Sequence, residues 1–175
     1  MDSTSTKILV LGIMAFATMS ASAQKCKVTD KVDPFTKERT IFTESKMIFN
    51  RMTYKGDNWS LSIGFRLKND TLAAIIDTGT STYTMGLSVI QFLFSDSEVL
   101  ALDKRMPDSV FGFQGQFSDM YHSLDYFVLT KENLERLASR KVTTLRMGEH
   151  STREISEKDS QKINLIATCM LEIID

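Results

Sequence analysis

The chain has 175 residues, of which 42% are hydrophobic and 25% are charged, with 21 Lys and Arg against 22 Asp and Glu. This length allows one domain or at most two small ones, and the composition excludes a disordered, collagenous, coiled-coil or disulfide-dense chain. The formal net charge of −1 argues against a nucleic-acid-binding protein, because such proteins usually carry a basic excess.

The first 23 residues have the layout of a secretory signal peptide. Lys7 supplies positive charge, residues 8–19 form an apolar run, and Ala21-Ser22-Ala23 offers the small residues that signal peptidase requires. A membrane anchor is the alternative, but the apolar run at 8–19 is shorter than the about 20 apolar residues that a spanning helix needs. We therefore predict cleavage after Ala23, a secreted or periplasmic location, and a mature domain of residues 24–175 without a transmembrane segment.

Cys26 and Cys169 lie near the two ends of the mature chain. A disulfide persists in the oxidising compartment that an exported protein enters, and two cysteines allow only one intramolecular pairing. We expect a Cys26–Cys169 disulfide, with two free thiols as the alternative; closing so long a loop contributes about 5 kcal/mol in the chain-entropy model. Neither cysteine has a second ligand at metal-binding spacing, and His122 and His150 stand alone. We therefore predict no metal site and no cofactor.

The first part of the mature chain predicts antiparallel β-structure. Residues 26–54 read as strands with a turn at 33–36. Apolar residues alternate with small or polar ones over residues 59–67, which is typical of a half-buried strand. A turn at 68–70 and a second strand at 71–76 complete a predicted hairpin.

The middle of the chain predicts a second hairpin over residues 89–102, followed by a long loop over 103–122 with one short strand at 110–113. The loop combines three glycines with several aromatic side chains. These aromatics either line a binding surface or pin the loop to the core, and they are Phe111, Phe113, Phe117 and Tyr121.

The C-terminal third predicts two helices among strands. Thr130 is a good N-cap for a helix over 131–139, in which Glu132 and Arg136 have the spacing of an ion pair. From about residue 159 the apolar residues fall on one helical stripe. The remaining predicted strands are 124–129, 142–147 and 152–156. The expected fold class is α+β: one domain rich in antiparallel β-sheet, with two helices in its C-terminal third.

One motif suggests chemistry. Residues 74–81, Ala-Ile-Ile-Asp-Thr-Gly-Thr-Ser, resemble the active-site signature of aspartic proteases, with Asp77, Thr78 and Gly79 as its centre. The resemblance implies a homodimer of the retroviral type, in which an Asp77 from each chain shares one proton and activates water. The Asp-Thr-Gly sequence is also ordinary turn chemistry, so a strand ending in a turn is the alternative.

The layout as a whole resembles small secreted proteins of Bacteroides-like gut bacteria, most of them of unknown function. The resemblance implies a periplasmic or surface location and supplies no catalytic residues. The segments that carry it are 33–36 soon after Cys26, 94–99, 126–134 and 144–146.

From these patterns we expect an exported, non-enzymatic domain that binds an envelope or protein partner and no nucleic acid. Two alternatives stay open. One is the dimeric aspartic protease centred on Asp77, and the other is a module that binds a small ligand or a peptide through the 103–122 loop.

Overall fold

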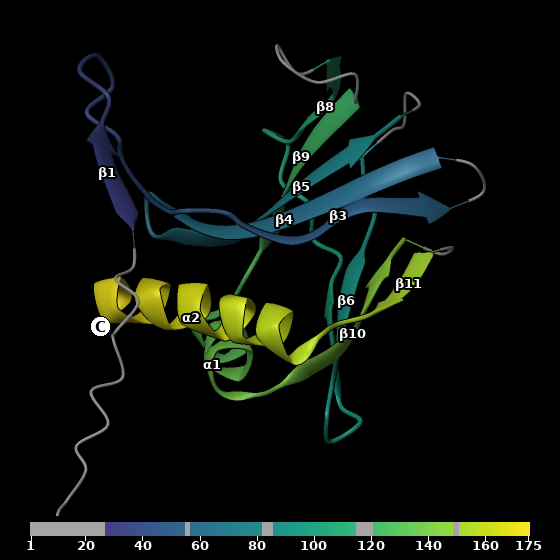
Figure 1. Cartoon of the computed structure of the whole chain (residues 1–175). Helices are drawn as coiled ribbons and strands as arrows, with labels where there is room; N and C mark the ends of the chain where they lie inside the picture. The colour runs from purple at the N-terminus through teal and green to yellow at the C-terminus, as the bar shows by residue number, and fades with distance from the viewer. Residues whose placement is uncertain (1–26, 55–56, 82–85, 115–120, 149–150) are drawn as a thin grey trace, which may run out of the picture.

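The computed structural model describes residues 27–54, 57–81, 86–114, 121–148 and 151–175, which form two antiparallel sheets and two helices (Figure 1). The predicted α+β class is confirmed. The strands are β1 (Val28–Val32), β2 (Arg39–Thr43), β3 (Lys46–Tyr54), β4 (Asp57–Lys68), β5 (Thr71–Thr80), β6 (Ile90–Phe94), β7 (Val99–Leu102), β8 (Val110–Gln114), β9 (Tyr121–Val128), β10 (Val142–Met147) and β11 (Ser151–Glu154). The helices are α1 (Lys131–Ser139) and α2 (Glu157–Ile174).

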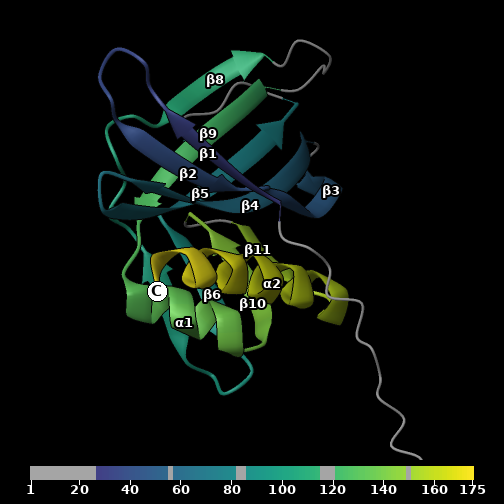
Figure 2. The same ribbon diagram turned by 90° about the vertical axis from the view of Figure 1, so that its left-hand side faces the viewer.

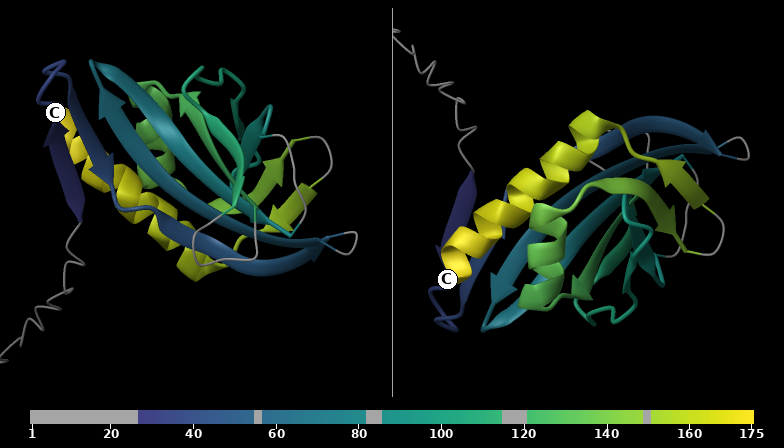
Figure 3. Two further views of the ribbon diagram at one scale, coloured as in Figure 1. Left: turned by 90° about the horizontal axis from the view of Figure 1, so that it is seen from above. Right: turned by 90° about the horizontal axis from the view of Figure 1, so that it is seen from below.

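The large sheet has the strand order β1-β2-β4-β5-β9-β8, and β3 pairs with β4 beyond the end of β2. The small sheet has the order β11-β10-β6-β7. Helix α2 contacts β2, β3 and β4, and α1 packs on α2 (Figure 2). Both helices and the small sheet lie on one face of the large sheet, here called the inner face. Seen from above, neither α1 nor α2 lies over the opposite or outer face (Figure 3).

The core lies between the inner face, α2 and the small sheet. Alternate residues of β4 and β5 point into it, which is the period of two that the sequence showed. Each large apolar side chain buried there contributes about 1.5–3 kcal/mol. Its fully buried members include Leu61, Ile63 and Phe65 of β4, Ile76 of β5, Phe92 of β6, Leu145 of β10 and Ile163 of α2.

The predicted hairpin over residues 59–76 is present as β4 and β5, and it is longer than expected. Asn69 and Asp70 both have positive φ, 47° and 61°, which matches a two-residue type I′ turn. The prediction that the second strand ends at Ile76 is wrong. β5 continues to Thr80, because Thr78 and Thr80 extend the alternation of buried side chains with polar residues.

A break between β2 and β3 lets two strands share one edge of β4. β2 pairs with Arg66–Lys68, and β3 pairs with Asp57–Ile63. At the break the buried N–H of Phe65 donates to Thr43 Oγ1 at 2.8 Å. Gly64 permits the close approach, since an added Cβ would lie 2.6 Å from Ser45 Oγ. Together these two features leave no buried N–H unpaired at Phe65.

A buried carboxylate connects the two sheets. Asp125 of β9 is fully buried, accepts a hydrogen bond from the Leu87 N–H at 2.9 Å and forms an ion pair with Arg105 at 2.5 Å. Burial raises the pKa of Asp125, and the Leu87 N–H and the Arg105 guanidinium oppose that rise. Leu87 precedes the β6–β7 hairpin and Arg105 follows it, so one side chain holds both ends of this hairpin.

The short strand predicted at 110–113 within the 103–122 loop is confirmed as β8, whereas Tyr121 and His122, predicted as the end of the loop, are the first residues of β9. The Lys104 carbonyl accepts from the Val128 N–H at 2.9 Å, and Arg105 forms a β-bridge with Phe127. β8 then pairs with β9, which begins at Tyr121. The chain therefore follows the edge of the large sheet before and after a short turn.

Several polar contacts hold α1 in place. Thr130 is its N-cap as predicted, and its Oγ1 accepts from the Asn133 N–H at 3.2 Å. Arg136 binds Glu98 of the β6–β7 turn at 3.0 Å instead of forming the expected pair with Glu132. Asn164 of α2 donates to two carbonyls at the end of α1, at 2.7 Å each. Within the described residues, no helix is long and apolar enough to cross a membrane.

Gly86 provides a test of the buried ion pair. An added Cβ would lie 2.2 Å from Arg105 Nη2 and 2.4 Å from Asp125 Oδ1. Because Asp125 is fully buried, we expect Gly86→Ala to separate the pair and to lower the free energy of unfolding by about 3 kcal/mol or more, measured by urea denaturation.

Gly148→Ala is the control for this substitution. Gly148 has a φ of +59°, and an added Cβ would meet nothing within 4 Å. We therefore expect Gly148→Ala to lower the free energy of unfolding by only about 1–2 kcal/mol, the cost of placing a non-glycine residue in the left-handed region. If both variants lost the same unfolding free energy, the Arg105–Asp125 ion pair would not depend on the missing side chain at Gly86.

Candidate functional site

The Asp-Thr-Gly sequence lies within a continuous strand. Asp77 pairs with Ser62 of β4 on one side and with Leu124 of β9 on the other. Thr78 is buried on the inner face, and Gly79 is extended between its two neighbouring strands. The backbone N–H groups here serve the sheet ladders, so the segment lacks the tight turn that the protease resemblance requires.

The Asp77 side chain instead meets His122 on the outer face. Asp77 Oδ1 lies 3.1 Å from His122 Nδ1, and the two side chains are 33% and 23% exposed. Asp77 lies in β5 and His122 in the neighbouring β9, where His122 pairs with Gly79, two residues after Asp77. A carboxylate in this position orients the imidazole, an arrangement that suits proton exchange or hydrogen bonding to a ligand.

The sequence did not reveal this pair. His122 was expected in a loop, whereas it is the second residue of β9. No group of three or more His, Cys, Asp or Glu side chains that could hold a metal ion occurs in the part of the chain that the structure describes. The pair therefore has no metal-ligand set around it in these residues.

A second cluster on the outer face is built around Arg66. Its guanidinium is nearly fully buried, stacks over the Tyr126 ring at 4.0 Å and donates to Asp108 at 2.7 Å and to the Met106 sulfur at 3.3 Å. The hydrogen bond from Arg66 lowers the pKa of Asp108. This cluster fastens residues 106–109 across the outer face and covers the sheet there.

The tip of the β1–β2 hairpin carries the most exposed large apolar side chain that the structure describes. Phe35 is 92% exposed. The turn beneath it is held by Asp33, whose Oδ1 accepts from the N–H groups of Phe35 and Thr36 at 2.8 and 2.9 Å. Lys37 closes the turn with a φ of 63°, and its N–H donates to the Asp33 carbonyl at 2.9 Å. Phe35 is thus presented to solvent by an ordered turn.

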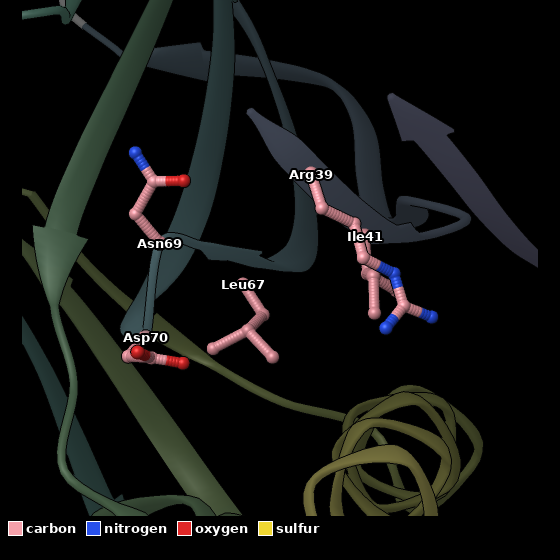
Figure 4. A pocket seen from close by; sticks show the side chains of 5 residues that line it. All are labelled: Arg39, Ile41, Leu67, Asn69 and Asp70. Carbon is pink, nitrogen blue, oxygen red and sulfur yellow. The ribbon is translucent and has the colours of Figure 1, made fainter. Parts of the chain in front are cut away.

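Two hollows flank this hairpin. One of about 410 Å³ lies beside its turn and is lined by Lys31, Val32, Asp33, Pro34, Glu38, Thr40, Phe42 and Lys68. The other, of about 130 Å³, is lined by Arg39, Ile41, Leu67, Asn69 and Asp70 (Figure 4). Ligand sites usually measure about 300–1,000 Å³, so only the first has a suitable size.

The other predicted site residues are only partly placed. Tyr121 is half-buried at the start of β9, opposite Thr80. Phe111 and Phe113 belong to β8, but their side chains and all of Phe117 lie outside the described residues. An aromatic binding surface on 103–122 therefore stays a prediction.

The predicted disulfide is also not tested. Cys169 is nearly fully buried on α2. Cys26 and the predicted signal peptide lie outside the described residues. The pairing of the two cysteines and the cleavage after Ala23 therefore stay predictions.

Comparison with known proteins gives no match: no family model fits the chain, and no curated protein or solved structure is significantly similar to it. The function is therefore inferred from the geometry of the chain itself.

The Arg66–Asp108 pair should make stability depend on pH. The pKa of Asp108 is lower in the folded chain, so its ionised form stabilises the fold above the ordinary carboxyl range. That contribution disappears as the pH falls through the lowered pKa. At pH 7 we expect Asp108→Asn to cost about 1 kcal/mol, because Asp108 itself is partly exposed.

The measurement is urea denaturation of wild type and variant between pH 7 and pH 3. The difference in unfolding free energy should shrink as the pH falls. The exposed Asp103, changed to Asn, is the matched control and should show little effect at any pH. A difference for Asp108→Asn that is independent of pH would contradict an electrostatic role.

Proposed function

We propose that this chain is an exported, non-enzymatic binding domain that contacts a protein of the cell envelope through the tip of the β1–β2 hairpin. The exposure of Phe35 carries the proposal. Folding normally buries a phenylalanine, and doing so is worth about 1.5–3 kcal/mol. A phenylalanine left in water gains the same free energy when a partner covers it, and aromatic anchors dominate many interfaces.

The ordered turn makes Phe35 a good anchor. Three backbone N–H groups are already bound by Asp33, so the loop loses little conformational freedom when it docks. The hollow beside the hairpin turn offers a second contact, and its lining includes the apolar Phe42 and the charged Lys31. Anchor and hollow lie on the same hairpin, so a single partner can engage both.

The placement of Asp77 favours binding over peptide hydrolysis. Its carboxylate is held by His122, and the strand around it is paired on both sides. An aspartic protease needs a second carboxylate close enough to share a proton. We propose an envelope partner because the signal-peptide layout of residues 1–23 predicts that the chain is exported.

A photo-crosslinking experiment tests the hairpin tip. Phe35 is replaced by p-benzoylphenylalanine in the producing cells, and Val99 serves as the matched control because it is 52% exposed on the other sheet. We expect one discrete protein adduct from position 35 and none from position 99. For the captured protein, Phe35→Ala should weaken binding about 10–100-fold, and Val99→Ala less than about 2-fold. Identical adducts from both positions, or none from 35, contradict the proposal.

Casein hydrolysis at acid pH tests the protease alternative. We expect no hydrolysis by wild type and none by Asp77→Asn, because Asp77 lies in a paired strand with His122 as its partner. Hydrolysis by wild type that disappears in Asp77→Asn would support the protease instead. The variant is assayed beside its thermal unfolding curve, so that loss of fold is not mistaken for loss of activity.

A further inference from the structure

We infer that β1 is a self-association edge, through which two copies of the chain pair antiparallel about a two-fold axis. In the part of the chain that the structure describes, β1 pairs with β2 on one side only. All five of its residues are exposed. This inference does not use Phe35, and its test does not depend on the proposed function, although Val32 also lines the hollow beside the hairpin turn.

The hydrogen bonds that flank β1 show which backbone groups face outward. The Glu44 N–H donates to the Lys27 carbonyl at 2.8 Å, and the Asp33 N–H donates to the Glu38 carbonyl at 2.9 Å. Antiparallel partners exchange such bonds at every second residue. The odd-numbered residues of β1 therefore turn their N–H and C=O groups toward β2. Those of Val28, Asp30 and Val32 point away from the sheet.

This alternation selects one register for a symmetric pair. In an antiparallel pair of two β1 strands, residues with outward backbone groups must lie opposite each other. Only one alignment pairs all three such residues of one strand with all three of the other. It places Asp30 opposite Asp30 of the second copy, and Val28 opposite Val32 of the second copy. The six outward backbone groups of each strand then find partners, which joins the two large sheets into one.

The side chains suit that register. Val28 and Val32 are 37% and 58% exposed, and the two-fold axis brings them together twice. The two Asp30 carboxylates meet at the axis, but each is already bound by Arg39, through Nε at 3.0 Å and Nη2 at 2.6 Å. Two Arg39–Asp30 ion pairs, each without net charge, therefore meet at the axis, and no unpaired carboxylates face each other. Apolar pairs directly opposite each other stabilise such ladders.

The contact is short, so it should be reversible. A five-residue edge falls below the roughly 1,000 Å² of typical specific interfaces, and charged residues on an edge limit further growth. We expect a monomer–dimer equilibrium that is visible at roughly 0.1–1 mM, and no larger aggregate.

Sedimentation equilibrium of the purified protein from roughly 10 µM to 1 mM measures this association. Val32→Pro removes an outward N–H and one valine from each apolar pair without touching the β1–β2 ladder. We expect it to raise the dimer dissociation constant at least about thirtyfold.

Val99→Pro is the matched control, because Val99 is a valine of similar exposure in an edge strand of the other sheet. It should dimerise like wild type. A wild type that stays monomeric, or equal effects of the two proline variants, would overturn the inference.

Hydrogen exchange of the wild type gives a second readout that needs no variant. The amides of Thr29 and Lys31 should be protected at every concentration, because they face β2. The amides of Val28, Asp30 and Val32 should gain protection only as the concentration rises. Protection of these three that does not change with concentration would contradict pairing through this edge.

Discussion

The two sheets depend on the fully buried carboxylate of Asp125. It binds Leu87 just before the β6–β7 hairpin and Arg105 just after it, and so fixes where this hairpin enters and leaves the large sheet. Burying a charge is costly unless it is paired and hydrogen-bonded, and both conditions are met here. Gly86 is part of the same arrangement, since any side chain there would occupy the space of the ion pair.

The position of the small sheet also decides which surfaces remain available. The small sheet and α2 together cover the inner face of the large sheet, and among the described residues no helix or second sheet covers the outer face (Figures 1 and 3). The outer face holds the polar contacts between Asp77 and His122 and between Arg66 and Asp108. At the β1–β2 hairpin the described residues leave Phe35 at the tip and all five residues of β1 exposed.

Local signals in the sequence predicted much of the fold. The period of two over residues 59–67 and the N-cap at Thr130 identified β4 and α1, because alternation and capping are properties of short segments. The C-terminal end of β5 and the first residues of β9 were missed since buried positions there hold polar residues, Thr78 and Thr80 in β5 and Ser123 in β9. The pairing of Asp77 with His122 joins residues 45 apart, and no local pattern reports such a contact.

The contacts of Asp125 with Leu87 and Arg105 also affect the order of folding. Its contact with Leu87 spans 38 residues, whereas the β4–β5 turn needs only two. Closing the longer loop costs more chain entropy, so local hairpins form before it. Asp125 therefore keeps its hydration until Leu87 and Arg105 are both in place. Removal of water from this carboxylate therefore belongs with the other long-range contacts of the fold, such as the β5–β9 and β6–β10 pairs, and follows the local hairpins.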